Sequence, residues 1–359
     1  MKTFLYFIVA ALGLAVAVPT ADEFEALQTR VQTLEARVEK LEATPAPVAA
    51  SLDRLVKLGS FTLQDDPAHT VGDDKLGHSA GLIAFDEAGT LWCIARSGKK
   101  FAPFKVPADL ASPSVQSGPW QDFTGGVAFP NFDSSIRGVV RHNGQWVMTV
   151  APYYNGTNVP WILAGGKMLQ GSVHQRKAAG YLTSYDGKLY SGLAGIPISQ
   201  DCSKGPPAFE WDLGAEPIQC AEKLYYSTPH PEWYQGVADV DEIRGLCCGD
   251  NYRLFFGKRP VGKVWYGDGS KHPTLAGVVD PCSPYQGFHS EGSTSAAWLY
   301  DQDWKYIGFA RLDTLLGLTG SCNRILCATG HGGRMYVVTK GTGLEPKPVV
   351  NVLEFRQAL

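Results

Sequence analysis

From about residue 81 onward, hydrophobic and polar positions alternate in short runs separated by tight polar turns. A period of two is typical of β-strands, and a polar turn between two such runs is typical of a β-hairpin. Five times, a short apolar strand is followed by a turn and then by an aromatic-rich strand. The predicted hairpins span 81–96, 137–152, 180–195, 244–258 and 324–340.

The turns of these hairpins contain glycine, asparagine and aspartate, which adopt the positive φ angles that tight hairpins need. The predicted turns are Glu87-Ala88-Gly89, Asn143-Gly144, Asp186-Gly187, Gly249-Asp250-Asn251 and Gly332-Gly333. The GHGG at 330–333 lies inside one of these hairpins. We therefore interpret it as a turn and not as an oxyanion-binding motif.

The hairpins recur at intervals of tens of residues, and each is followed by further strand-like segments such as those at 296–312. This pattern predicts the four-stranded blades of a β-propeller. The fold class is all-β, with five blades favoured and six as the alternative. Residues 55–63 are expected to pair with 349–356 and complete the last blade. A two-sheet sandwich is the competing all-β interpretation, and the repeated hairpin argues against it.

A different periodicity precedes the propeller, which is assigned to 55–359. In 24–42, the apolar residues Phe24, Leu27, Val31, Leu34, Val38 and Leu41 occupy heptad positions a and d, as in a coiled coil. We predict a stalk over 22–42 that forms a homo-oligomer, with a trimer favoured and a dimer as the alternative. A single amphipathic helix lying on its own domain is the other interpretation. The Pro/Ala-rich segment 43–54 is the predicted linker.

The first 17 residues predict export. Lys2 precedes an apolar run from Phe4 to Val16, and Ala15-Val16-Ala17 is a small-x-small cleavage site. The apolar run is short for a membrane span. We expect a signal peptide over 1–17, a secreted, periplasmic or cell-surface location, and no membrane span after cleavage. An uncleaved anchor is the alternative.

Composition narrows the range of functions. The 359 residues carry a formal net charge of −3, which does not suggest a nucleic-acid partner. No dinucleotide, P-loop, zinc-protease or nucleophile-elbow motif occurs, so no cofactor and no metal are predicted. Eight cysteines in an exported chain favour disulfides. The disulfide candidates are Cys202, Cys220, Cys282 and Cys322.

Several segments resemble a family of exported bacterial β-propeller proteins that is uncharacterised. They include RGLCCGDNYRLFFGKRPVGKVWYGDG, VDPCSPYQGFHSEG, AAWLYD and GRMYVVTKGTG, together with GYLTSYDGKLYSG and SKGPPAFEWDL. The resemblance covers roughly 78–356 and omits the stalk. It implies the fold and no activity, cofactor or site residue.

The first candidate site consists of polar residues that precede or begin the innermost strand of each blade, near the mouth of the central channel. The IRG of 136–138 and 243–245 is an internal repeat that places arginines at equivalent heights, where they suit an anionic ligand. Inter-blade ion pairing is the structural alternative. The residues are His78, Asp133, Arg137, Arg176, Asp239, Asp241, Arg244 and Arg324.

The second candidate site is the Gly/Pro-rich excursion 265–292, since long loops on a rigid scaffold often carry function. A structured cap is its alternative interpretation. Its polar residues are Asp268, His272, Asp280, His289 and Glu291.

Two functions follow from these features. The first is an exported, oligomeric β-propeller binding protein that recognises an extracellular ligand such as an acidic carbohydrate. Multivalency supports it, because gathering weak sites on one stalk raises avidity. The alternative is a secreted carbohydrate-active hydrolase or lyase, a glycoside hydrolase in the first instance, with its site at the channel mouth. Such an enzyme needs two carboxylates across the channel.

Overall fold

The computed structural model describes residues 52–76, 82–95, 98–129, 134–152, 161–171, 178, 180–192, 203–232, 242–266, 288–319, 325–340 and 347–356. The chain divides into two compact units, 1–48 and 49–359, and the described residues all belong to the second. The signal peptide, the stalk and most of the linker lie outside the described residues and stay predictions. No helix in the described ranges is long and apolar enough to cross a membrane.

The described residues form an all-β structure. Three separate antiparallel sheets have four strands each. They are β2(Ile83–Phe85)-β3(Leu91–Ile94)-β4(Lys100–Phe104)-β6(Gln121–Asp122), β7(Ser134–His142)-β8(Gln145–Pro152)-β9(Trp161–Ala164)-β10(Lys167–Gln170) and β11(Leu182–Tyr185)-β12(Lys188–Ser191)-β13(Ala208–Asp212)-β14(Gln219–Leu224).

A nine-stranded sheet holds the remaining strands. One half is β15(Glu242–Gly249), β16(Tyr252–Tyr266), β17(Phe288–Tyr300) and β18(Tyr306–Arg311), and the other is β19(Ile325–His331), β20(Arg334–Lys340), β21(Pro348–Phe355) and β1(Leu55–Gln64). A short parallel contact between β15 and β19 joins the halves, and β5(Ala111–Gln116) adds to β1. Two short helices, η1(Leu52–Arg54) and α4(Asp313–Leu316), complete the described elements.

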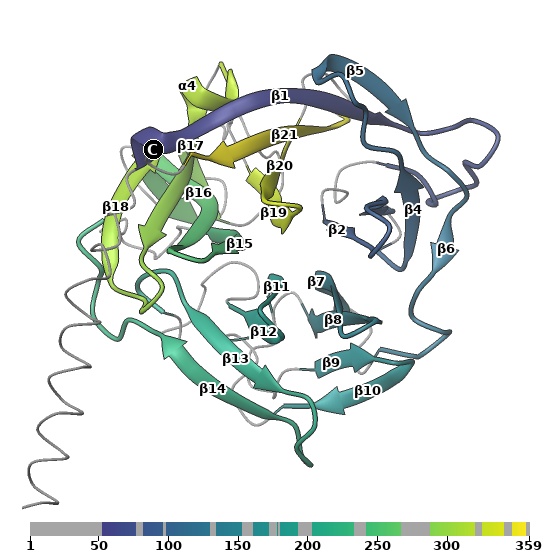
Figure 1. Cartoon of the computed structure of the whole chain (residues 1–359), viewed down its shortest axis with the longest axis horizontal. Coiled ribbons are helices and arrows are strands. Elements are labelled where there is room, and N and C mark those ends of the chain that lie inside the picture. Colours follow the sequence, from purple (N-terminus) through teal and green to yellow (C-terminus); the bar gives the residue numbers. More distant parts are fainter. Residues whose placement is uncertain are drawn as a thin grey trace, which may run out of the picture. The chain divides into compact units, whose positions relative to one another are not determined.

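The first strands of the four-stranded units lie around a common centre. Contacts run from β2 to β7, β11, β15 and β19, and then back to β2. Figure 1 shows these strands innermost, with β6, β10, β14, β18 and β1 at the periphery. This arrangement resembles that of a β-propeller. The predicted pairing of 55–63 with 349–356 is confirmed, because β1 runs antiparallel to β21 from Leu55↔Phe355 to Thr62↔Val349.

Hydrophobic side chains fill the spaces between neighbouring units, because each central strand has an apolar residue on both faces. On β16, Leu254 and Phe256 pack toward the β19 unit, while Phe255 packs toward the β11 unit. The aromatic residues at one place in each hairpin pack between units in the same way. Trp92 meets Trp146, and Tyr336 meets Phe85 at 4.5 Å.

The five predicted hairpins are all present, but their turns differ. Asn143, Asp186 and the glycines that follow them have positive φ, as do Gly332 and Gly333. The expectation of positive φ is wrong for Gly249-Asp250-Asn251, where no residue adopts it. Here glycine serves a different purpose. A Cβ on Gly249 would lie 2.3 Å from a ring carbon of Tyr252, so glycine lets that ring approach.

The IRG repeat marks a β-bulge beside a close approach of two units. The register shifts between Ile136 and Gly138 in β7, and between Ile243 and Gly245 in β15. A Cβ on Gly138 would lie 2.3 Å from the Gly180 carbonyl oxygen, and one on Gly245 would lie 2.2 Å from that of Ala328. Glycine therefore allows the first strands of neighbouring units to approach each other.

The excursion expected over 265–292 is shorter than predicted. Strand β16 continues to Tyr266 and β17 begins at Phe288, and the pairing reaches Trp265↔His289 and Tyr266↔Phe288. The run Val264-Trp265-Tyr266 explains the extension, because β-branched and aromatic residues favour strands. Residues 267–287 lie outside the described residues.

Candidate functional site

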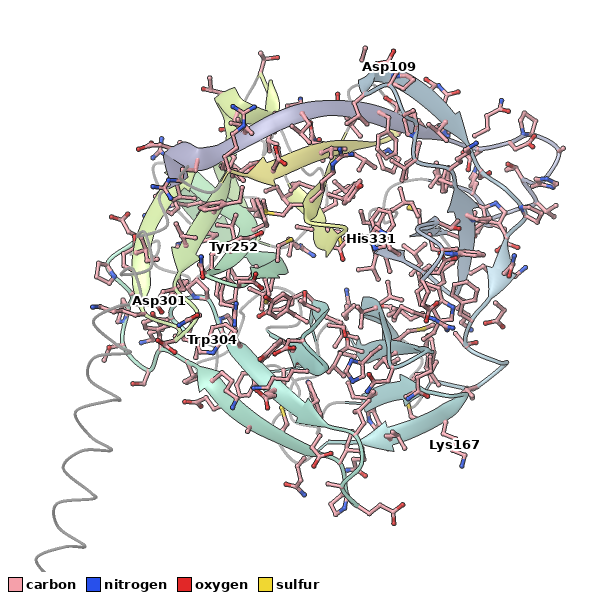
Figure 2. All side chains as sticks on the ribbon, viewed as in Figure 1. Asp109, Lys167, Tyr252, Asp301, Trp304 and His331 are labelled. Atoms are coloured by element: carbon pink, nitrogen blue, oxygen red, sulfur yellow. The ribbon has the colours of Figure 1, made fainter. Side chains whose placement is uncertain are left out.

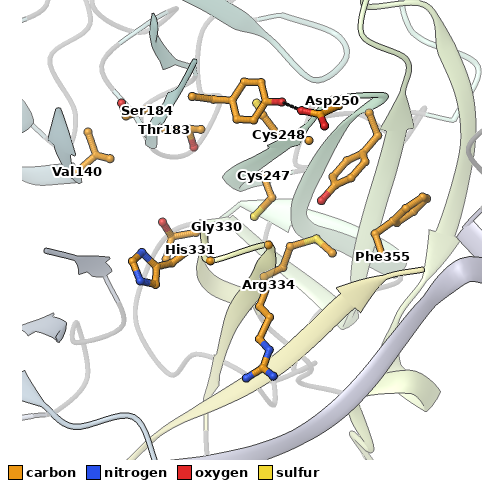
Figure 3. A pocket seen from close by; sticks show the side chains of 17 residues that line it. Val140, Thr183, Ser184, Cys247, Cys248, Asp250, Gly330, His331, Arg334 and Phe355 are labelled. Atoms are coloured by element: carbon orange, nitrogen blue, oxygen red, sulfur yellow. Dashed lines mark hydrogen bonds between the residues drawn. The ribbon is translucent and has the colours of Figure 1, made fainter. Parts of the chain in front are cut away.

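A pocket of about 400 Å³ lies where the first strands end in their hairpin turns (Figure 3). Strand β11 contributes Thr183, Ser184 and Tyr185 to its lining. The β15–β16 hairpin contributes 247–250 and Tyr252, and the β19–β20 hairpin contributes 329–335. Val140 and Phe355 complete it. Figure 2 shows His331 beside the central region, whereas Asp109 and Lys167 lie at the periphery.

A hydrogen bond between Tyr185 and Asp250 connects two units at the pocket wall. The Tyr185 hydroxyl donates to Asp250 Oδ1 at 2.5 Å (Figure 3). Burial, together with the hydrogen bond to Asp250, raises the pKa of Tyr185 to about 12. The tyrosine therefore stays a neutral hydrogen-bond donor, and Asp250 presents its second oxygen, Oδ2, from an exposed turn.

Arg253 holds this wall in place without lining the pocket. Its Nη1 donates to the carbonyl oxygens of Gly249 at 2.5 Å and Tyr252 at 2.8 Å, which flank the turn that carries Asp250. Its guanidinium lies against the rings of Tyr185 and Trp304, at 5.2 and 5.7 Å. The side chain is only 9% exposed. Arg253 is thus a buried brace between the turn and the tyrosine.

Ser184 and His142 form a second cross-unit contact beside the pocket. His142 Nδ1 lies 2.8 Å from Ser184 Oγ, and Asn143 Nδ2 lies 3.1 Å from His142 Nε2. An amide nitrogen can only donate, so Nε2 accepts and the ring proton sits on Nδ1, which donates to the serine. Burial lowers the pKa of His142 and keeps it neutral. With this tautomer His142 takes no proton from Ser184, so the pair is not an activated nucleophile.

The β19–β20 hairpin forms the opposite wall. The His331 ring stacks on Phe85 with a centroid separation of 4.4 Å and an interplanar angle of 7°. Arg334 is exposed, and in Figure 3 its guanidinium points away from the Tyr185–Asp250 pair. The positive charge of the same guanidinium partly offsets the effect of burial, which raises the pKa of Tyr336. The positive charge of this wall is therefore turned outward.

The floor of the pocket contains two neighbouring thiols. Cys247 packs with the β19 unit and Cys248 with the β11 unit, as expected for adjacent residues of one strand, and both are unbridged. Burial raises the pKa of Cys248 to about 12, and that of Cys247 is also raised well above its ordinary value. Both thiols are therefore protonated, non-nucleophilic groups at neutral pH.

Between the β2 and β7 units the hairpin ends are filled with aromatic rings. Phe123 is sandwiched between Phe101, at 5.2 Å and 10°, and Trp146, at 4.7 Å and 18°. The guanidinium of Arg141 covers the Trp146 ring at 5.2 Å and pairs with Glu87 at 2.8 Å. The rings and the ion pair pack closely between these two hairpin ends.

The structure tests few of the predicted site residues. Arg137 and Arg244 are half-buried at the two IRG bulges, and neither lines the pocket. Six residues of the first candidate site lie outside the described residues: His78, Asp133, Arg176, Asp239, Asp241 and Arg324. So do Asp268, His272 and Asp280, and of His289 and Glu291 only the backbone, in β17, is described.

The disulfide candidates have a similar outcome. Cys202, Cys282 and Cys322 lie outside the described residues, and Cys220 is half-buried on β14. Their pairing stays a prediction. Among the described residues no group of three histidine, cysteine or acidic side chains is placed to hold a metal ion.

The residues that line the pocket were not among the sequence-based candidates. Asp250 and His331 occur in Gly-rich turns, where they were interpreted as turn formers only. Their signal was present, because both are polar residues at equivalent turns of the repeated hairpin. The predicted site used the other end of the same strands.

No protein-family model matches the chain, and neither does any curated protein sequence. Among solved structures, it is similar to an aldose sugar dehydrogenase from Streptomyces coelicolor, with 13% identity and a TM-score of 0.36 over 86% of this chain and 99% of that one. A GDP-Man-dependent mannosyltransferase from Leishmania mexicana has 8% identity and a TM-score of 0.41, over 90% and 95%.

A Penicillium chrysogenum α-L-arabinanase has 12% identity and a TM-score of 0.32, over 85% of this chain and 100% of that one. Similarities of this degree assign neither a family nor an activity. The resemblance to exported bacterial propellers therefore stays a prediction.

Proposed function

We propose that residues 55–359 form a five-bladed β-propeller that binds a small carbohydrate in the pocket at its hairpin ends. The observation that carries this proposal is the pocket wall itself. Tyr185, Asp250 and Ser184 present hydroxyl and carboxylate groups beside the rings of Tyr252 and Phe355. Sites for small ligands combine apolar surfaces with a few convergent polar groups, and the volume of about 400 Å³ suits them.

A sugar matches this lining because it offers hydroxyl groups along its edges and C–H groups on its faces. The Tyr252 and Phe355 rings pack on each other with their centroids 4.7 Å apart, and they supply an apolar part of the lining, which suits C–H groups. The Oδ2 of Asp250 accepts a hydroxyl hydrogen, and charge-assisted bonds of this kind are the stronger ones. The Tyr185 bond and the Arg253 brace fix the carboxylate before a ligand arrives, which lowers the entropic cost of binding.

Binding is favoured over hydrolysis in this pocket. A glycoside hydrolase needs two carboxyl groups about 5 to 9.5 Å apart. Asp250 is the one carboxylate among the described residues that line the pocket. The Ser184–His142 pair supplies no substitute, because Ser184 accepts a hydrogen bond there and gives up no proton.

Export and oligomerisation are further parts of the proposal. Residues 24–42 would gather several propellers on one stalk and multiply weak affinities by about 10² to 10⁴. Sedimentation tests this part. The chain from Val18 onward is expected to be an oligomer, preferably a trimer, and the chain from Leu55 onward a monomer. Equal masses would show that the stalk does not assemble.

Saturation-transfer NMR against a panel of monosaccharides and disaccharides tests the binding function. We expect at least one sugar to bind the wild-type protein, and Asp250→Ala to weaken its binding by about tenfold. Asp109→Ala is the matched control, because Asp109 accepts the backbone N–H of Ala111 at the periphery, away from the pocket. Failure of every sugar to bind, or equal losses in both variants, would contradict the proposal.

A further inference from the structure

The charged groups that line the pocket indicate which charge its ligand can have. This inference rests on the proposed carbohydrate-binding function. Three groups of its lining can carry charge: Asp250, Arg334 and His331. The direction in which each group points matters more than the number of groups. The interaction energy between a charge and a ligand depends on the distance between them and on how strongly solvent screens the charge.

Asp250 directs negative charge at the ligand. Its Oδ1 already accepts the Tyr185 hydroxyl at 2.5 Å, which leaves Oδ2 for a bound molecule. Among the described residues no lysine, arginine or histidine forms an ion pair with this carboxylate. A hydroxyl donor of the ligand is therefore attracted, and a carboxylate placed beside Oδ2 is repelled.

Neither of the two arginines nearby donates a hydrogen bond to this carboxylate. The guanidinium of Arg334 points away from the Tyr185–Asp250 pair (Figure 3). The guanidinium of Arg253 lies outside the pocket lining, where two backbone carbonyls and two rings enclose it. Its Nε has no hydrogen-bond partner and is buried from solvent, so it offers no accessible donor to an anion.

We infer that the pocket accepts neutral sugars and discriminates against their uronic acids, with Asp250 as the residue that determines this specificity. The acidic ligand expected from the arginines of the IRG repeat does not suit this pocket. Arg137 and Arg244 do not line it.

Paired sugars test the inference directly. Glucose and glucuronic acid differ only at C6, as do galactose and galacturonic acid, so each pair keeps the ring and changes the charge. We expect titration calorimetry at pH 7 and low salt to give at least tenfold tighter binding for the neutral member of whichever pair binds. Raising the salt to about 1 M should reduce that ratio, because screening weakens repulsion and leaves shape unaffected.

Asp250→Asn provides the decisive variant, since the amide keeps the shape of the side chain and its acceptor oxygen for Tyr185 but loses the charge. We expect the ratio to fall below about threefold in Asp250→Asn and to stay unchanged in the control Asp109→Asn. Equal binding of both members by the wild-type protein, or an unchanged ratio in Asp250→Asn, would overturn the inference and leave carbohydrate binding intact. Absence of binding by all four sugars and by the wider panel would overturn the proposed function itself.

Discussion

Hairpins of the same backbone form end on two sides of the central region. Side chains fill the space between the hairpin ends on one side and leave a pocket on the other. Between the β2 and β7 units, Phe123 is stacked between Phe101 and Trp146, and Arg141 covers the outer ring. Between the β11, β15 and β19 units, a pocket remains open. We call these the filled region and the open region.

Each region has one polar link that crosses from a first strand to the turn of a neighbouring unit. In the filled region Arg141 pairs with Glu87, and the two charges compensate each other. In the open region Tyr185 donates to Asp250, and the carboxylate keeps its charge. The repeated hairpin supplies the scaffold, and the side chains beside each turn decide whether a junction is structural or able to bind.

The largest effect is expected from the two glycines at which first strands of neighbouring units approach each other. Gly245→Ala places a Cβ about 2 Å from the backbone of Ala328, and Gly138→Ala does the same at Gly180, so neighbouring first strands must separate. We expect each variant to lose about 3 kcal/mol of unfolding free energy in denaturant titrations. Gly308→Ala is the control, because its nearest neighbour would be 3.8 Å away. A loss under about 1 kcal/mol would mean that the strands are not tightly joined there.

The second prediction separates the two regions. Phe123→Ala removes the central ring of the stack, and we expect it to lower the unfolding free energy by about 2 to 3 kcal/mol. Because the filled region does not reach the pocket lining, sugar affinity should be unchanged in calorimetric titrations. A parallel loss of affinity would show that the two regions are coupled.

Tyr185→Phe tests the open region, where we expect a loss of sugar affinity with little change in stability. It removes the hydroxyl that orients Asp250, an exposed residue that water can solvate instead. We expect sugar affinity to fall about fivefold to tenfold, while the unfolding free energy changes by about 0.5 kcal/mol. Tyr306→Phe, on the outer strand β18, should leave affinity unchanged. A large stability loss without loss of affinity would make Tyr185 a structural residue.

The smallest effect concerns pH. Burial lowers the pKa of His142 and of His230 below the usual 6.5. The unfolded chain therefore binds more protons than the folded one as the pH falls below about 6.5, so stability decreases in that direction. We expect the melting temperature to drop by a few degrees between pH 7.5 and 5, and His142→Asn to reduce that drop. An unchanged drop would show that His142 does not contribute to it.

Sequence patterns predicted most of the fold. The repeated hairpins gave the all-β class and the five pairs of central strands, and the leftover segment 55–63 gave the pairing of β1 with β21. The period of the hydrophobic positions and the composition of the turns depend on residues that are close in the sequence. Both can therefore be interpreted without knowing which strands become neighbours in the fold. The length of β16 was missed, because the Gly/Pro content beyond Tyr266 outweighed the strand-forming residues before it.

The pocket could not be predicted in the same way. Its wall depends on which turns face each other, as when Tyr185 of β11 meets Asp250 of the β15–β16 turn 65 residues later. The IRG repeat illustrates the opposite error. Its regular arginines suggested a binding site, but its glycines have the clearest role, which is to allow close approach of strands.

The methionine methyl groups test the central claim most directly, because one of them lies in the open region and two lie in the filled region. Met335 lines the pocket, whereas the buried Met148 and the half-buried Met168 of strand β10 belong to the hydrophobic cluster that contains Phe123. In methyl NMR spectra of methionine-labelled protein, a neutral sugar that binds is expected to shift the Met335 signal and leave those of Met148 and Met168 in place. A shift at Met148 or Met168 with Met335 unchanged would contradict a sugar site in the open region.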